Sequence, residues 1–390
     1  MHRYLAVLAL CGSVLHAETV LVLPFFNHSK TPGLDWIGES ISEAIHDSLA
    51  SEGMLVLDRD DRLEAYHRLS LRPGAELTHA SILKIGQALD AGSIIYGSYE
   101  VLDPARDQSK GSLRVTARAV DLKRLRQGSD FSELGPLEDL AVIETRLSWR
   151  TLLSLNPKPA KTEEEFVRNR PAVRLDAAES YVRGLMASNA EQRHRFFTQA
   201  ARLDVRYSQP RFQLGKSAWA AKDYQVAAGW LTNVNRSDPH YFEGQFLLGL
   251  CKYASGDFAG AEQAFQLVAV NVPLNEVYNN LGAAQSRRGN AAQARDSFAK
   301  ALEGDSADPD YHFNLGYVLW RSGKFSEAVD SLRAVVARSP GDTEATTLLG
   351  RALKQDGPRP GETRFEARER LKSKYEETAY RQLQAELQSK

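Results

Sequence analysis

Residue types that carry catalysis are scattered along this chain and do not form a known catalytic motif. The sequence has no Gly-x-x-x-x-Gly-Lys phosphate loop, no Gly-x-Gly-x-x-Gly turn, no His-Glu-x-x-His zinc motif and no Gly-x-Ser-x-Gly nucleophile elbow. No two histidines beyond residue 17 are four residues apart, the spacing that would place both on one helix face. We therefore expect a protein without enzyme activity, cofactor or metal ion.

Two short polar clusters could still bind an ion or a small ligand. One is acidic and consists of Asp58, Asp60 and Asp61. A helix N-cap followed by acidic residues in the first turn explains it better than a cation site, which would need a cage of oxygen ligands. The other consists of Asn27, His28 and Ser29. It follows the first predicted strand, where α/β domains often bind ligands, although these residue types are also typical of turns.

The composition excludes several classes of protein. The 390 residues carry 49 Lys and Arg against 50 Asp and Glu, a net charge of −1, so we expect no nucleic-acid binding through bulk positive charge. Hydrophobic residues make up 43% of the chain, which is enough for a folded core. The two cysteines are too few for a disulfide scaffold. Cys251 lies in an apolar helical stretch and is expected to be buried.

The first 17 residues have the pattern of a secretory signal peptide. Arg3 gives a basic start, an apolar run of eleven residues follows, and Ala17 provides a cleavage site. The run is too short to span a bilayer, which takes about 20 residues. A lipoprotein signal that uses Cys11 is the alternative, but Leu10 stands where a small residue is preferred. We expect an exported protein that is periplasmic or associated with a bacterial envelope.

The second half of the chain repeats with a period of 33 or 34 residues. One series of glycines, each preceded by leucine, consists of Gly215, Gly249, Gly282, Gly316 and Gly350. A second series consists of Gly256, Gly289, Gly323 and Gly357, and alanines recur in the same register at Ala227, Ala261, Ala294 and Ala328. The first glycine would allow close helix packing, the second would end the helix in a left-handed conformation, and the alanine would lie where two helices cross.

In period and residue types this pattern resembles the tetratricopeptide repeat. That repeat is a helical hairpin, which must stack on its neighbours to bury its apolar face. We expect four full repeats, at 208–241, 242–274, 275–308 and 309–342. A shortened unit at 176–207 precedes them, and a half unit at 343–357 follows.

The resemblance implies a concave groove lined by the first helix of each repeat. Aromatic residues and arginine, which are frequent in binding hot spots, recur at the positions that face inward in this family. The predicted groove residues are Phe212, Lys216, Trp219, Phe246, Tyr253, Asn279, Arg287, Phe313, Tyr317, Trp320 and Arg321. Some of the aromatic ones could serve packing between helices instead. Asn280 and Asn314 invite comparison with a carboxylate clamp, but the lysines of such a clamp are missing.

The first half of the chain alternates strand and helix patterns. Strands are predicted at 19–26, 54–57, 93–102, 112–122 and 128–134, and helices at 34–52, 59–70, 79–90 and 137–155. The fold class is therefore α+β with several domains. A small α/β domain with a mixed sheet is followed by an all-α tetratricopeptide-repeat solenoid.

Three stretches of the first half carry a second resemblance. Residues 22–29 (Val-Leu-Pro-Phe-Phe-Asn-His-Ser) resemble the opening strand of the TolB amino-terminal-like domain, and residues 84–99 and 113–121 resemble two later segments of it. This domain is related in fold to the flagellar envelope protein FlgO and, more distantly, to the curli secretion channel subunit CsgG. The resemblance implies an envelope adaptor without catalytic residues, in a family where tetratricopeptide repeats often follow.

The expected domains are a signal peptide at 1–17, the α/β domain at 18–156, a polar linker at 157–173, the repeat array at 174–357 and a charged C-terminal part at 358–390. In the last part, apolar residues recur every four positions at Leu371, Tyr375, Ala379, Leu383 and Leu387. This pattern predicts a helix that caps the solenoid. A partner-binding tail is the alternative.

Taken together, the sequence predicts an exported, non-enzymatic adaptor. Its repeats would bind a protein or peptide, and its N-terminal domain would dock on an envelope assembly. Two alternatives stay open: a component of a secretion channel or surface organelle, and a ligand-sensing α/β domain coupled to the repeats. No nucleic-acid partner is expected, and the oligomeric state is not indicated.

Overall fold

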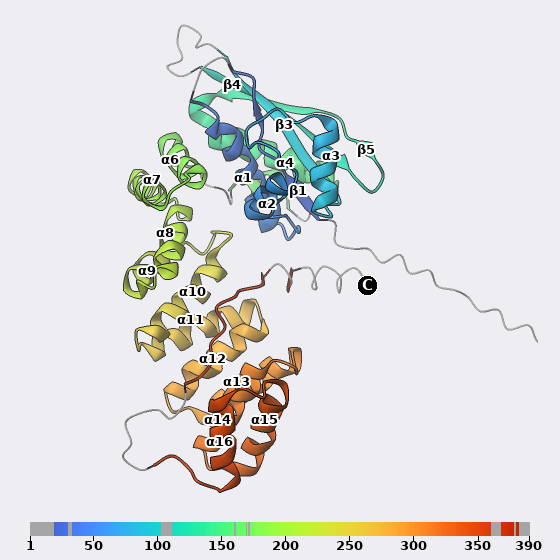
Figure 1. Ribbon diagram of the computed structural model, residues 1–390. Coiled ribbons are helices and arrows are strands. Elements are labelled where there is room, and N and C mark those ends of the chain that lie inside the picture. The colour runs from blue at the N-terminus through green and yellow to red at the C-terminus, as the bar shows by residue number, and fades with distance from the viewer. Residues whose placement is uncertain are drawn as a thin grey trace, which may run out of the picture. The chain divides into compact units, whose positions relative to one another are not determined.

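The chain forms two compact units, which meet in the sequence at Ala172 and Val173 (Figure 1). The computed structural model describes residues 19–29, 33–102, 111–159, 161–168, 170, 172–359, 368–377 and 380–381. The predicted signal peptide and Cys11 lie outside these residues. Within the described part of the chain, no helix has the length and apolar character needed to cross a bilayer.

The first unit is built on a mixed sheet, as the sequence predicted; the sheet has six strands. Its strands are β1 (Val20–Val22), β2 (Phe26–Asn27), β3 (Ser93–Leu102), β4 (Ser112–Asp121), β5 (Arg126–Gln127) and β6 (Phe131–Pro136). β3 pairs in parallel with β1 and β2 and antiparallel with β4, which in turn pairs with β5 and β6. The parallel pairing of β1 with β3 requires the helical crossover that lies between them in sequence.

Helices pack on this sheet through apolar side chains. They are α1 (Trp36–Ser51), α2 (Arg59–Arg68), α3 (His79–Ala88) and α4 (Leu140–Leu155), the last preceded by a 3-10 turn at Leu137–Asp139. α2 and α3 contribute Tyr66, Ile82 and Ile85 to a core that also contains Leu21 and Ile94 from the strands. α1 and α4 pack against each other, and α4 also packs on β4 and β6.

The structure departs from the predicted elements at several places in this unit, one of which is β5, a strand that the sequence did not predict. The first predicted strand is divided into β1 and β2, with Pro24 between them, because proline cannot donate to a strand ladder. The predicted strand at 54–57 is reduced to one bridge between Val56 and Val20. The predicted linker contains a short helix, α5 (Glu163–Arg168), whose Phe166 is fully buried against Trp149 at a ring-centroid distance of 5.2 Å.

A buried carboxyl group lies between α1 and α4. Glu144 of α4 is only 8% exposed, and its Oε1 accepts a hydrogen bond of 2.6 Å from the Ser40 hydroxyl of α1. Burial raises the pKa of Glu144 from 4.5 to about 7, because desolvation disfavours the charged form. Ionising this residue in the folded protein therefore costs stability.

Replacing Glu144 with glutamine tests this cost. Between about pH 4.5 and pH 7 the folded state keeps the proton that the unfolded chain has lost, so the wild type loses stability as pH rises through this window. We expect Glu144→Gln to stabilise the first unit at pH 8 by on the order of 2–3 kcal/mol and to have little effect at pH 4. The free energy of unfolding is measured by urea unfolding of the full chain, with hydrogen exchange in α4 as the readout. Glu76→Gln, at an exposed position, is the control.

The second unit is a stack of antiparallel helix pairs (Figure 1). The pairs are α6 (Leu175–Met186) with α7 (Ala190–Leu203), α8 (Gln209–Ala220) with α9 (Tyr224–Leu231), α10 (Tyr241–Ala254) with α11 (Phe258–Asn271), α12 (Asn275–Arg287) with α13 (Ala291–Gly304), and α14 (Pro309–Arg321) with α15 (Phe325–Arg338); α16 (Thr343–Leu353) follows alone. This succession of helices is the one expected from the repeat pattern.

Three of the four glycines of the second series, and all the recurring alanines, have the predicted roles; after α16 the positive φ is at Gln355 (+55°) and not at the predicted Gly357. Gly256, Gly289 and Gly323 have φ values of +84°, +81° and +74° and end the inner helices α10, α12 and α14. In the first full repeat Lys222 takes the same role, with a φ of +62°. The recurring alanines are fully buried, because the two helices of each pair cross there: Ala227, Ala261, Ala294 and Ala328.

Four of the five Leu-Gly glycines permit close helix packing as predicted, and Gly350 does not. A Cβ at Gly249 would lie 2.6 Å from Cε1 of Phe265, a ring that is fully buried. We expect Gly249→Ala to lower the free energy of unfolding by about 1–3 kcal/mol, because neither helix can yield without repacking. Gly350→Ala is the matched control, since no atom lies within 4 Å of its added Cβ, and it should be neutral or slightly stabilising. Equal thermal shifts for the two variants would contradict the packing argument.

The predicted capping helix is wrong for residues 368–376, which are not helical. We call residues 368–377 the C-terminal segment. Its backbone groups bond to side chains of the repeats instead of to its own preceding turn. The remaining residues of the predicted helix lie largely outside the described part of the chain.

Candidate functional site

The C-terminal segment lies along the inner helices of the last repeats (Figure 1). We call the surface of α10, α12, α14 and α16 that contacts it the segment-binding face. Arg370 contacts α14 and the start of α16, Lys372 contacts α12 and α14, and Tyr375 contacts α10. The segment therefore runs opposite to the order of the repeats.

Two asparagines bind the backbone of the segment. Asn314 Nδ2 donates to the Arg370 carbonyl at 2.8 Å, and its Oδ1 accepts from the Arg370 N–H at 2.7 Å. One repeat earlier, Asn280 makes the same pair of bonds with Lys372, both at 2.8 Å. The N–H and C=O groups of alternate residues in an extended chain point to the same side, so two asparagines one repeat apart can hold residues two apart. This contact is independent of the peptide's side chains.

A third asparagine fixes the orientation of one of these amides. Asn279 Nδ2 donates to the Arg370 carbonyl at 2.8 Å, and its Oδ1 accepts from Asn314 Nδ2 at 2.7 Å. The three asparagines on α12 and α14, including Asn280, are fully buried with the segment in place. Buried amides need hydrogen-bond partners, and here the segment's backbone provides several of them.

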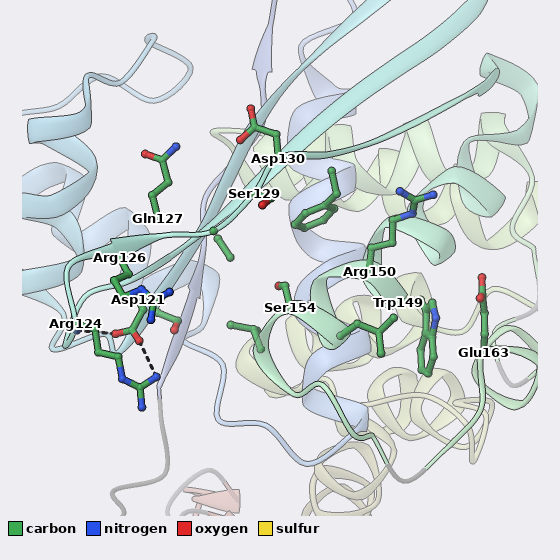
Figure 2. Close-up of a pocket in the computed structure, with 16 residues that line it drawn as sticks. Asp121, Arg124, Arg126, Gln127, Ser129, Asp130, Trp149, Arg150, Ser154 and Glu163 are labelled. Atoms are coloured by element: carbon green, nitrogen blue, oxygen red, sulfur yellow. Dashed lines mark hydrogen bonds and ion pairs between the residues drawn. The ribbon is translucent and has the colours of Figure 1, made fainter.

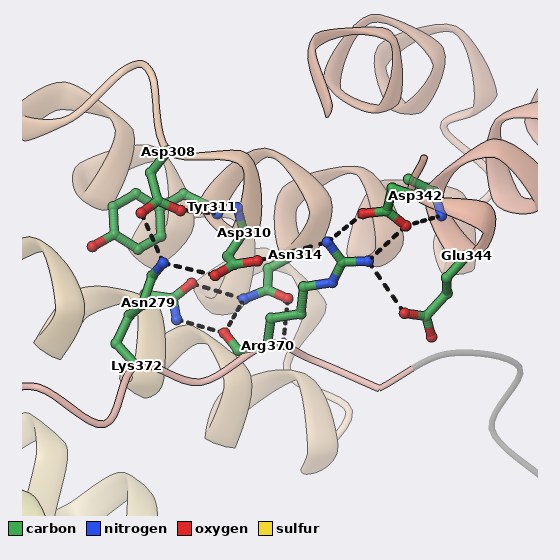
Figure 3. A network of polar contacts seen from close by, with 10 residues as sticks. Asn279, Asp308, Asp310, Tyr311, Asn314, Asp342, Glu344, Arg370 and Lys372 are labelled. Carbon is green, nitrogen blue, oxygen red and sulfur yellow. Dashed lines mark hydrogen bonds and ion pairs between the residues drawn. The ribbon is translucent and has the colours of Figure 1, made fainter. Parts of the chain in front are cut away.

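The Arg370 side chain lies against carboxylates and an aromatic ring, and Figure 3 shows its guanidinium pointing toward Asp342 and Glu344. Its guanidinium forms ion pairs with Asp342 Oδ2 at 2.6 Å and Glu344 Oε2 at 3.2 Å. The same group stacks over Phe313, with Cζ 3.6 Å from the ring centroid. The hydrogen bond from Arg370 lowers the pKa of Asp342 below its ordinary value.

Lys372 is bound by two further carboxylates on the same face (Figure 3). Its Nζ lies 2.7 Å from Asp308 Oδ2 and 2.7 Å from Asp310 Oδ2. Burial alone would lower the pKa of Lys372, but the hydrogen bonds to these carboxylates raise it, so the side chain stays charged. Asp308 and Asp342 are also the N-caps of α14 and α16, which fixes their position at the start of successive inner helices.

Glu369 is the most buried charged residue of the segment. An arginine and two hydroxyl groups of the repeats bind its carboxylate. Its carboxylate accepts from Ser286 Oγ at 2.6 Å and forms an ion pair with Arg287 Nε at 2.7 Å, with both charged side chains no more than 5% exposed. Tyr253 Oη donates to it at 3.1 Å, and burial next to this carboxylate raises the pKa of Tyr253. Charges that leave water in this way need close partners.

Apolar contacts complete the binding of the segment. Leu371 and Tyr375 pack against the apolar core shared by the middle repeats. The Tyr375 ring lies 5.3 Å from that of Phe246. The side chains of residues 369–372 and of Tyr375 thus each meet a partner on the face, whereas Ser373 and Lys374 are exposed.

The structure brings six of the eleven predicted groove residues to the segment: Phe246, Tyr253, Asn279, Arg287, Phe313 and Arg321. The other five make contacts within the repeats. Phe212 stacks on His240, Lys216 pairs with Glu243, and Trp219 packs on the repeat core. Tyr317 and Trp320 are each 1% exposed, and the Trp320 indole N–H donates to the Asp356 carbonyl at 2.8 Å.

Several contacting residues were outside the predicted set. They are Asn280, Asp308, Asp310, Asn314, Asp342 and Glu344. A signal for four of them was present in the sequence, because Asn280 and Asn314 are 34 residues apart, as are Asp308 and Asp342. The two asparagines hold a peptide backbone rather than a terminal carboxylate.

The polar clusters of the first unit have structural roles. Asn27 Oδ1 accepts from the Ser29 N–H at 2.8 Å, and Ser29 Oγ accepts from the Val101 N–H at 2.7 Å, as in turns. Asp58 forms a capping box with Asp61 at the start of α2. In the described part of the chain, no group of three or more His, Cys, Asp or Glu residues is placed to hold a metal ion. Cys251 is buried, as expected, and burial raises the pKa of its thiol to about 11.

The first unit also has an open polar cavity of about 800 Å³ near β5 and the end of α4 (Figure 2). Arg124 and Arg150 line it, but each already pairs with a carboxylate, Asp121 at 3.3 Å and Glu133 at 2.6 Å. The cavity is remote in sequence from the Asn27 cluster, where a ligand had been considered.

The stacked helix pairs define the second unit as a tetratricopeptide-repeat solenoid. Residues 212–276, 279–343 and 314–358 match the family model of the tetratricopeptide repeat. A TPR repeat-containing protein of Pseudomonas aeruginosa is 45% identical over 56 residues, which cover 14% of this chain. The chain spans about half (53%) of the length of that relative.

Solved structures with similar folds include MamA from Desulfovibrio magneticus. It is 20% identical, with 44% of this chain and 99% of that chain covered and a TM-score of 0.39. YrrB, described as a TPR protein with an unusual peptide-binding site, is 18% identical, with 44% and 86% covered and a TM-score of 0.37. The resemblance of the first unit to the TolB amino-terminal-like domain stays a prediction.

The asparagine contacts predict how the segment is held in solution. We expect Asn314→Ala to raise the hydrogen-exchange rate of the Arg370 and Lys372 amides at least about tenfold, because a buried bidentate contact is worth a kcal/mol or more. Asn271→Ala is the control, since the Asn271 amide donates to the Leu267 carbonyl of its own helix. Unchanged exchange in the segment of Asn314→Ala, measured by mass spectrometry, would show that Asn314 does not hold it.

Proposed function

We propose that this protein is a non-enzymatic adaptor that binds an extended segment of a partner protein on the segment-binding face. One observation carries the proposal: Asn280 and Asn314 each bind both the N–H and the C=O of a residue in an extended chain. Such contacts suit a peptide and do not suit a compact metabolite. The charged and aromatic pockets beside them supply side-chain selectivity.

We further propose that the adaptor is exported and that its first unit docks on an envelope assembly. Support for export comes from the signal-peptide pattern of residues 1–17. Support for docking comes from the resemblance of residues 18–156 to the TolB amino-terminal-like domain. The mixed sheet with helices packed on it is compatible with that resemblance.

Site-specific photo-crosslinking in the native cell tests the adaptor role. A photo-reactive phenylalanine in place of Tyr253, whose hydroxyl contacts the C-terminal segment, should crosslink to a second polypeptide. The crosslinked product should fall at least about fivefold when Asn280 and Asn314 are both alanine, because the partner's backbone then loses its bidentate contacts.

The matched control carries the same photo-reactive residue at Asp296, an exposed position on the outer helix α13. A product that forms equally from both positions, or that is unaffected by loss of the two asparagines, would contradict partner binding on this face.

Two other functions remain as alternatives. A component of a secretion channel or surface organelle would be favoured by lipidation at Cys11, whereas a mature chain that begins at Glu18, seen by intact mass, would count against it. A ligand-sensing role for the first unit would use the polar cavity of Figure 2, which Arg126 and Gln127 also line.

A further inference from the structure

We propose that the C-terminal segment is a resident ligand, which keeps the segment-binding face occupied until a partner segment of the same pattern displaces it. The pattern is that of residues 369–375: Glu, Arg, an apolar residue, Lys, two unrestricted residues and an aromatic residue. This inference rests on the proposed function and names both the partner's chemistry and the regulation of the face.

Each restricted position of the pattern has its own partner on the face. The acidic residue meets Arg287 and Ser286, and the arginine meets Asp342 and the ring of Phe313. A glutamate in place of the arginine would lie against carboxylates, which is strongly unfavourable in a partly buried site.

The remaining positions narrow the pattern further. Lysine meets Asp308 and Asp310, and the aromatic residue meets Phe246. The two unrestricted positions correspond to Ser373 and Lys374, which are exposed. A partner segment must also be extended and must run from the last repeat towards the second, because the side-chain pockets occur in that order.

Binding of the segment and of a partner must be mutually exclusive. Each bidentate asparagine uses its amide oxygen and nitrogen on one backbone residue, so a second chain cannot be added beside the first. Residues 358–367 connect the segment to the end of the repeats, and a short tether gives an effective concentration of about millimolar. The apparent affinity of a free peptide is therefore reduced in proportion to the fraction of molecules whose segment-binding face is unoccupied.

The contacts between the segment and the face also allow a partner segment to replace it. Several of the ion pairs are partly exposed, with side-chain exposures of 43% for Glu344 and 31% for Asp310, and such pairs contribute little individually. A partner that supplies the same groups restores every contact that the segment gives up, including those of the buried asparagines. Displacement then needs only a partner whose local concentration or extra contacts exceed the advantage of the tether.

A peptide of sequence Arg-Glu-Arg-Leu-Lys-Ser-Lys-Tyr-Glu-Glu, residues 368–377, is the probe. Its binding to the full chain is measured by fluorescence anisotropy. We expect the variant Glu369→Ala/Arg370→Ala, altered only in the segment, to bind the probe at least about tenfold more tightly than the wild type, because its own segment is weakened while the face is intact. Lys374→Ala, at an exposed position of the segment, should bind like the wild type.

A charge-reversed probe, with glutamate at the position of Arg370, tests the pattern. It should bind the opened variant at least about tenfold more weakly than the native probe. Circular dichroism melting confirms that each variant is folded, and Arg370→Ala alone provides a milder opening if the double variant is unstable.

The outcomes separate this inference from the proposed function. Equal affinity of the wild type and the opened variant for the native probe would overturn the resident-ligand role. Equal affinity of the opened variant for the native and charge-reversed probes would overturn the pattern but leave a peptide-binding face. Probe binding that persists when Asn280 and Asn314 are alanine would overturn the proposed function itself.

Discussion

A peptide backbone that leaves water must keep its N–H and C=O groups hydrogen bonded, and this requirement governs the C-terminal half of the molecule. Within the repeats, the hydrogen bonds inside each helix satisfy this requirement. The C-terminal segment has no such helix, and the bidentate amides of Asn280 and Asn314 satisfy it instead. The asparagines depend equally on the segment, because they are fully buried beside it. Stacking of the repeats places these two amides one repeat apart. The spacing of the repeats therefore sets the spacing of the two backbone contacts in the binding site.

The side-chain contacts add selectivity to this backbone contact. Asp308 and Asp342 cap the inner helices α14 and α16, and the same carboxylates bind Lys372 and Arg370. These two aspartates thus cap their helices and at the same time supply part of an acidic surface. The net charge of the chain is near zero, yet this face binds the cationic side chains of Arg370 and Lys372 and the buried carboxylate of Glu369. Specificity in this protein is local and does not depend on overall charge.

The repeat architecture could be predicted from the sequence because each unit imposes the same packing constraint on glycine and alanine, as at Gly249 and Ala261. The site was predicted only in part. Trp320 looked like a groove residue, but aromatic side chains at inner-helix positions also fill the space between helices, and here it is buried. The segment's apolar spacing of four residues suggested a helix. That expectation failed because Leu371 and Tyr375 find apolar partners on the repeats, and long-range contacts of this kind outweigh local periodicity.

The distance between the segment and the repeats, measured in solution, tests the account most directly. Spin labels at Ser373→Cys and Ser255→Cys, both exposed positions, can be placed in the full chain with Cys11 replaced by serine, while the native Cys251 is buried. Double electron–electron resonance should give one narrow distance distribution in the wild-type background and a broad one when Asn280 and Asn314 are alanine. A broad distribution in the wild-type background would contradict the claim that the segment is held on the repeats.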